Sequence, residues 1–398
     1  MNHPPDSVAS ALPIAVAAQG SARAYSRAAV WLLLLAAAVL LASLLWDFSW
    51  ESTVGIDRVW APAHTAGYLA VALAGGTALV RVFACSRDAA GGASGVRLGR
   101  LHAPLGVWLT LWGALGFLAA VLFDRWWQSS YGLAAGIWHP PQILKAISFF
   151  AVVAGAWLAG LHRQNNATAK GGPGRAFAFA VGGGLMLALI TIVSLTSIYP
   201  NRQHSAPFYQ FACGTYPVVL VASTVAGKVR WPATIAAAAY LGLICLLVWV
   251  LPLFPASPQV APVYNQLDHL MPPPFPLLLV APAAVLDALF QRFPWPANRA
   301  RPWLQAFAAG LAFLLVFAGT QWIFSEFLLT DLAENRFFAG GGQHWPFFLK
   351  IDPLARTAFW ESPQDEFNPA RLLGAAALSV VSAGAGVWAG AWMARLRR

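Results

Sequence analysis

The sequence predicts an all-α, polytopic membrane protein built from about ten transmembrane helices. Of its 398 residues, 59% are hydrophobic and only 10% are charged. A soluble domain carries roughly 25% charged residues, so this composition excludes one. Apolar runs of about 17–25 residues recur along the chain, and each is long enough to cross a bilayer as a helix. The runs lack the alternation of polar and apolar residues that strands of a membrane barrel show.

Ten segments of the chain are candidate spans, and their even number predicts that both termini lie on one side of the membrane. The sixth is the weakest, because it is short and contains Pro217. We expect residues 1–28 to form a cytoplasmic tail and residues 29–398 a single transmembrane domain, with a long outer loop near 327–369. The first run is interpreted as an uncleaved helix, because no cleavage site precedes Trp46. The spans are 29–46, 64–84, 103–123, 142–161, 176–197, 211–227, 232–253, 273–291, 303–326 and 371–394.

The distribution of charge predicts the orientation. Lysine and arginine gather in the loops on the side of the termini, which should therefore be cytoplasmic, as in a bacterial-type inner membrane. The net charge of +10 reflects this orientation rather than nucleic-acid binding, because the basic residues are scattered between apolar segments. Every acidic residue except Asp6, Asp88 and Asp287 falls on the opposite, outer side. Five histidines accompany them: His64, His139, His204, His269 and His344.

The cysteines exclude three arrangements. Cys85, Cys213 and Cys245 form no CxxC pair. They cannot supply a disulfide framework, a zinc ribbon or four thiolates for an iron–sulfur cluster.

Two stretches gather ionisable and aromatic residues where an apolar run ends. They read WDFSWESTVGIDRVWAPAH, residues 46–64, and FDRWWQSSYGLAAGIWHPPQ, residues 123–142. Each leaves an apolar run, turns at a glycine and enters the next run through a proline, so we expect repeated helical hairpins with polar outer tips. Alignment pairs Asp47 with Asp124, Trp50 with Trp127 and, after one inserted residue, Trp60 with Trp138.

A second pair of stretches shares the pattern Tyr-x4-His-x2-Pro. It places Tyr199 before His204 and Tyr264 before His269. A tyrosine at this spacing can hold an imidazole in one tautomer, as groups around metal sites do. The alternative is a plain helix entry, in which the proline begins the next helix.

The first tip has the residue types of a metal site. Asp47 and Glu51 are four residues apart and share one face of a helix, and a turn can return His64 to them. Two carboxylates and an imidazole suit iron, manganese, zinc or copper and leave positions open for water or oxygen. We take His204 and His269 as alternative or additional ligands.

The spacing Asp47-x3-Glu51-x12-His64 resembles a known motif. It is similar to Asp-x3-His-x12-His, the copper-ligand motif in the C subunit of particulate methane and ammonia monooxygenases. The first and last ligands match, and the middle one is glutamate here. The resemblance covers some eighteen residues and implies copper-dependent oxygenase chemistry.

Aromatic and polar residues around both tips are candidates for binding a small apolar substrate from the bilayer. Tryptophans at this level also form the ordinary interfacial belt. Asp47 and Asp124 can simply cap helices or pair with Arg58 and Arg125, and Arg202 is a further possible partner of Asp124. The candidate substrate residues are Trp50, Trp60, Asp124, Trp127, Trp138 and His139.

Three functions remain open from the sequence. The first is a metal-dependent membrane oxidoreductase or oxygenase with its site on the outer face. The second is a transporter or substrate-binding permease. The third is an accessory subunit that packs against membrane partners or docks a periplasmic partner such as a cytochrome.

Glu326, at the end of the ninth span, is either a functional acid or a carboxylate at the level of the lipid headgroups.

Overall fold

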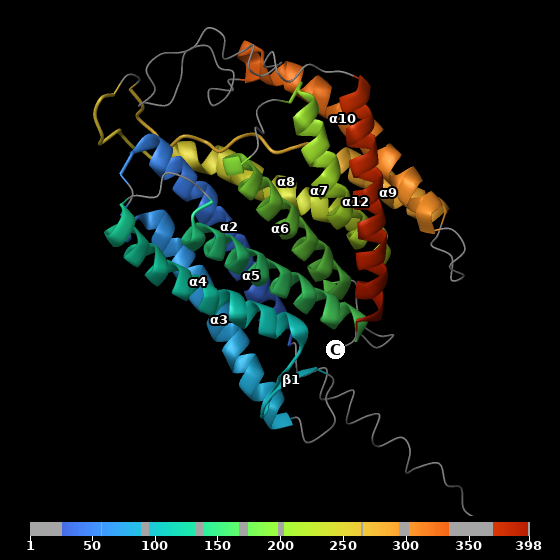
Figure 1. Ribbon diagram of the computed structural model, residues 1–398, viewed down its shortest axis with the longest axis horizontal. Coiled ribbons are helices and arrows are strands. Elements are labelled where there is room, and N and C mark those ends of the chain that lie inside the picture. Colours follow the sequence, from blue (N-terminus) through green and yellow to red (C-terminus); the bar gives the residue numbers. More distant parts are fainter. Residues whose placement is uncertain are drawn as a thin grey trace, which may run out of the picture. The chain divides into compact units, whose positions relative to one another are not determined.

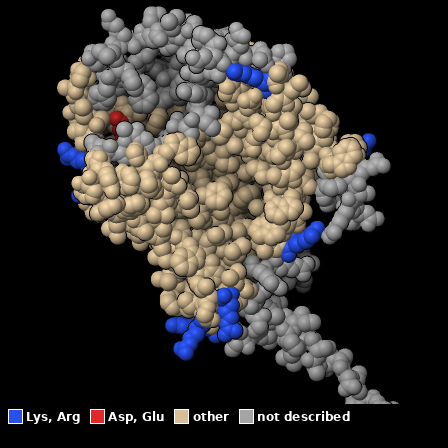
Figure 2. Space-filling view, viewed as in Figure 1, with Lys and Arg blue, Asp and Glu red and all other residues tan. Residues whose placement is uncertain are grey.

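A computed structural model of the chain confirms an all-α, multi-pass membrane protein (Figure 1). Within the part of the chain that the structure describes, nine helices are long and apolar enough to cross a membrane. Figure 2 shows few charged side chains among the described residues of one face, as lipid contact requires. The described residues are 26–56, 58–88, 95–132, 138–166, 174–197, 203–263, 266–293, 302–333 and 369–396.

Contacts divide the chain into two compact units, which are described separately. One contains residues 1–37, 70–182 and 395–398, and the other contains residues 38–69 and 183–394. The expected single transmembrane domain stays a prediction. The nine long helices are α2 (Arg27–Thr53), α3 (Pro62–Asp88), α4 (Leu105–Tyr131), α5 (Pro140–Asn165), α6 (Gly174–Ser197), α7 (Ala206–Ala226), α8 (Pro232–Val250), α10 (Pro302–Leu328) and α12 (Pro369–Arg395).

Both polar tips begin inside helices rather than in loops. Helix α2 continues to Thr53 and α4 to Tyr131, beyond the apolar runs that predicted them. Each helix is followed by a glycine in the left-handed region, Gly55 with φ 79° and Gly132 with φ 85°. A residue with a Cβ is strained at such a φ, so glycine suits the turn after a helix. Helices α3 and α5 then begin at a proline, as the sequence predicted.

In the first unit, α4 and α5 pack closely through small residues. A Cβ on Gly113 would lie 2.8 Å from the carbonyl oxygen of Ser148, and one on Gly155 would collide with Thr110. Close approach of this kind is how helices associate where water supplies no driving force. The same unit contains a small antiparallel hairpin that the sequence did not predict, β1 (Val96–Leu98) and β2 (Leu101–Ala103).

In the second unit, α7 is continuous through Pro217. A proline inside a helix leaves neighbouring backbone groups to find other partners. The N–H of Val218 donates to Ser382 Oγ of α12 at 3.0 Å. Helix α12 also packs on α10, where a Cβ on Gly310 would lie 2.6 Å from the backbone of Val380. The weakest predicted span is therefore a full helix held by its neighbours.

The predicted helix over 273–291 is wrong in its first part. Helix α9 (Val280–Arg292) has only 13 residues, and residues 271–279 form neither helix nor strand. Prolines at 272, 273, 274 and 276 remove the N–H groups that a helix needs. The segment still runs antiparallel to α8, since Leu277 meets Tyr240 at the middle of that helix and Asp287 meets Thr234 at its start. Two single turns, η2 (Leu251–Leu253) and η3 (Asp331–Ala333), complete the elements.

Candidate metal site at the end of helix α2

Close packing of α2 on α3 positions the first tip. A Cβ on Gly67 of α3 would lie 3.0 Å from Ser43 Oγ of α2, so the two helices nearly touch there. Asp47 lies one turn after Ser43, and His64 lies one turn before Gly67. The two side chains therefore face each other across the hairpin.

Asp47 and His64 form the central pair of the site. His64 Nε2 lies 3.1 Å from each carboxylate oxygen of Asp47. The other ring nitrogen, Nδ1, lies 3.0 Å from the carbonyl oxygen of Arg58. Both side chains are largely covered, with 24% of His64 and 22% of Asp47 exposed.

The hydrogen bonds determine what His64 can offer to Asp47. A carbonyl oxygen only accepts, so Nδ1 carries a hydrogen and donates it to Arg58. In a neutral ring, Nε2 then has a bare lone pair, and it faces a carboxylate that also only accepts. A proton, carried by the ring or by the carboxylate, or a bound cation must therefore lie between them.

Three features of these residues fit a metal ion. Asp47 Oδ1 is buried and accepts no well-aligned hydrogen bond within the described residues, although His64 Nε2 lies 3.1 Å away. A backbone carbonyl on the far nitrogen is one of the usual partners that orient a metal-binding imidazole. Nitrogen and oxygen ligands at about 2.0–2.2 Å from one ion lie about 3 Å apart, close to the spacing of this pair.

Glu51 is the third predicted ligand, and it is exposed one turn after Asp47. Across the described ranges, no three His, Cys, Asp or Glu side chains are grouped to hold a metal. The structure thus brings two of the five predicted ligands, Asp47 and His64, together. Glu51 lies one turn further along the same helix face.

The aromatic residues of the first tip flank the pair. Trp50 Nε1 donates to the carbonyl of Ile56 at 3.1 Å and so fastens the turn after α2. The His64 ring lies 6.2 Å from Tyr68, which meets Trp60 edge-on at 5.8 Å. Trp60 is 77% exposed, as expected for a residue of the interfacial belt.

His204 lies in a different polar cluster, between the start of α7 and the end of α10. Its buried Nε2 lies 3.1 Å from Ser325 Oγ and 3.3 Å from Glu326 Oε1. The Trp322 ring meets the imidazole edge-on at 4.3 Å. Glu326 therefore faces a histidine, which the sequence did not predict.

His269 lies in the loop between η2 and α9. Its Nδ1 is 2.5 Å from a carboxylate oxygen of Asp268, which is 95% exposed. The sequence predicted this neighbour as a possible partner. Tyr199, Tyr264 and His344 lie outside the described residues.

The second tip, in the first unit, has an ion pair where the first tip has its histidine. Lys145 Nζ donates to Asp124 Oδ2 at 2.6 Å. Asp124 is 8% exposed, so the pair neutralises a charge at the end of a span. The partner of Asp124 is therefore a lysine of α5 rather than Arg58 or Arg125, and the third expected arginine, Arg202, lies outside the described residues. A lone lysine inside the apolar run ILKAISFF was the sequence signal that could have identified it.

Two of the second tip's candidate substrate residues lie together. The Trp127 ring lies 4.6 Å from Tyr131 and 6.0 Å from His139. Trp138 is 77% exposed. Whether these residues contact a substrate stays a prediction.

Comparison with family models, with curated proteins and with solved structures finds no match. The resemblance to the copper monooxygenase motif therefore depends on Asp47, Glu51 and His64 alone.

Proposed function

We propose that this integral membrane protein binds a transition-metal ion between Asp47 and His64 and acts as a metal-dependent oxidoreductase. The observation that carries the proposal is the close approach of His64 Nε2 to both Asp47 carboxylate oxygens, with Nδ1 held by the Arg58 carbonyl. Copper, iron and zinc all accept such ligands. By the positive-inside rule, the site lies at the outer face of a bacterial-type inner membrane.

Each residue of the tip has a defined part in this proposal. Arg58 fixes the imidazole through its carbonyl, and Asp47 supplies negative charge. Glu51 is the predicted third ligand, and its side chain would have to move toward the pair to bind the same ion. A bound redox metal would supply electron transfer or oxygen activation, and zinc would instead supply an activated water. Trp60 and Tyr68 form an apolar flank on which a small apolar substrate can rest.

Metal analysis of the purified protein tests the proposal. We expect about one metal ion per chain in the wild type and less than roughly a tenth in His64→Ala. The matched control is His269→Ala, which removes a loop histidine and should leave the metal in place. A wild-type protein that holds less than a tenth of an equivalent after metal loading would contradict the proposal.

The permease remains a second candidate because of one observation. The chain passes beside α8 as a non-helical segment followed by the short helix α9. Interrupted spans of this type hold the substrate in many transporters. A role as an accessory subunit stays a prediction.

A further inference from the structure

The non-helical segment before α9, residues 271–279, is named the strap. Its residues are all buried or half-buried. It has four prolines, so its backbone cannot form the regular hydrogen bonds that a span needs. In a membrane, every remaining N–H group must find another partner.

Side chains from three helices supply those partners. The Met271 N–H donates to Thr53 Oγ1 of α2 at 2.9 Å, and the Met271 carbonyl accepts from Ser49. The Leu277 N–H donates to the Tyr240 hydroxyl of α8 at 2.9 Å. Next to it, the Leu278 N–H donates to Gln321 Oε1 of α10 at 2.9 Å. A few side-chain hydrogen bonds thus hold the strap in place.

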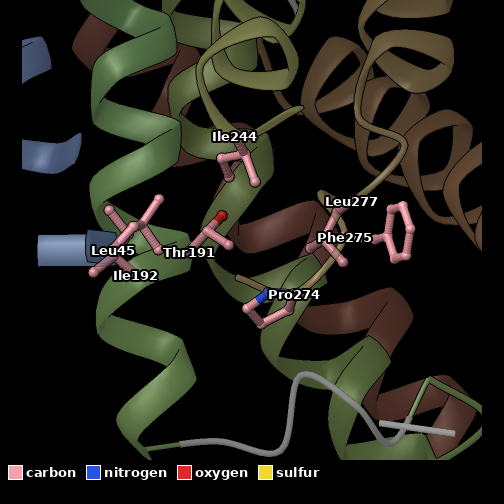
Figure 3. A pocket seen from close by; sticks show the side chains of 7 residues that line it. All are labelled: Leu45, Thr191, Ile192, Ile244, Pro274, Phe275 and Leu277. Atoms are coloured by element: carbon pink, nitrogen blue, oxygen red, sulfur yellow. The ribbon is translucent and has the colours of Figure 1, made fainter. Parts of the chain in front are cut away.

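The strap forms one wall of a small chamber. Figure 3 shows Thr191 and Ile192 on one side, Pro274 and Leu277 on the other, and the Phe275 ring pointing away. That ring packs edge-on against Phe324 of α10. The cavity has a volume of about 20 Å³, room for roughly one water molecule. Its lining residues are Leu45, Thr191, Ile192, Ile244, Pro274, Phe275 and Leu277.

The chamber has a single polar side chain. Thr191 Oγ1 lies 3.0 Å from the Leu187 carbonyl and 3.0 Å from the Tyr216 hydroxyl. The other lining side chains are apolar. This lining suits an uncharged, mostly apolar molecule with one hydrogen-bonding group, and it is unfavourable for an ion.

We propose that the strap is a gate: its release opens the chamber to a small, uncharged amphipathic molecule such as a short alcohol. The closed cavity is too small for such a molecule, so binding requires the strap to move. The hydroxyl of Tyr240 holds the strap at the middle of α8 and serves as the latch. This gate does not depend on the metal at Asp47 and His64.

Thiol labelling tests the gate. Ile244→Cys places a reporter in the chamber, with Cys85 and Cys245 replaced by alanine and the buried Cys213 kept as an internal reference. Loss of the hydrogen bond to the strap through Tyr240→Phe should speed labelling of the reporter by about five- to tenfold. The matched control is Tyr216→Phe, which removes a buried hydroxyl that bonds Thr191 and not the strap. Labelling of Cys213 should not change.

Two outcomes would overturn the gate. One is an unchanged labelling rate in Tyr240→Phe. The other is equal acceleration by both variants or at both cysteines, which would indicate general loosening.

Ligand protection tests the chemistry of the chamber. In the Tyr240→Phe background, 1-butanol should slow labelling of the reporter more than labelling of Cys213. Butyrate, of similar size but charged, should give no protection. Protection by butyrate alone, or by neither compound, would refute the assignment of an uncharged ligand.

Discussion

Asp47 and Ser49 are two residues apart on α2 and hold different parts of the second unit. Asp47 faces His64 of α3, while Ser49 donates to the Met271 carbonyl of the strap. Two residues turn a helix by about 200°, so the side chains point to nearly opposite sides. One helix end thus supports both the candidate metal site and the gate.

Removal of the metal should destabilise the wild type. If the ion is present at a hundred times its dissociation constant, it adds about 2.7 kcal/mol to the free energy of unfolding. A chelator should lower the thermal midpoint of the wild type and leave that of Asp47→Asn unchanged. Thermal unfolding in detergent measures both, and equal shifts in the two proteins would contradict a site at Asp47.

Breaking the ion pair between Lys145 and Asp124 should destabilise the protein strongly. Lys145→Ala leaves a buried carboxylate without a counter-charge, which costs about 3–5 kcal/mol. The double variant Asp124→Leu with Lys145→Met should recover most of that loss, because no charge is left buried. The free energy of unfolding of each variant is the measurement. A Lys145→Ala variant as stable as the wild type would show that the ion pair does not stabilise the protein.

Asp287 should act as a cap on the start of α8. Its carboxylate accepts from the Thr234 N–H at 2.8 Å, the Ala233 N–H at 3.3 Å and the Thr224 hydroxyl at 2.9 Å. Asp287→Ala leaves these donors unsatisfied, and we expect a loss of about 2–4 kcal/mol. Asp287→Asn keeps one acceptor oxygen and should lose less than half as much. Equal losses in the two variants would show that the hydrogen bonds are not responsible.

The α4–α5 contact should not tolerate a methyl group at Gly155. A Cβ there would lie 2.7 Å from the carbonyl oxygen of Gly106. Gly155→Ala should cost about 1–3 kcal/mol through overpacking. Gly76→Ala is the matched control, because nothing lies within 4 Å of its Cβ, and it should be neutral or slightly stabilising. Unfolding measurements that rank the two variants the other way would refute this packing.

Nine of the ten helices that the sequence predicted match long helices of the structure, because the signal of each is local and repeated over many residues. The prediction of a helix over 273–291, the eighth span, was wrong in its first part. Hydropathy does not distinguish this segment from the other spans, because it is equally apolar. Whether its prolines end the helix depends on whether neighbouring helices can supply partners for the backbone groups that are left without hydrogen bonds. Tyr240 and Gln321 accept hydrogen bonds from the N–H groups of the strap. Both lie more than thirty residues away along the chain, so no sequence pattern predicts these contacts. The strap was therefore not predictable from hydropathy.

The contacts of the candidate site were likewise predictable only where they are local in the sequence. The pairing of Asp47 with His64 follows from a short turn between two consecutive helices. The partners of Asp124 and His204 do not, because they depend on how separate helices are rotated and packed. Lys145 and Ser325 were missed for that reason.

By itself, the sequence determined the membrane environment, the tips and the turns at Gly55 and Gly132, because apolar length and backbone freedom act within a few residues. The tertiary structure alone decided which polar group meets which: His204 with Glu326, Asp287 with Thr234, and the strap with Tyr240. Where hydrocarbon surrounds the chain, buried donors and acceptors must find partners at any sequence distance, and only the packed helices define that distance in space.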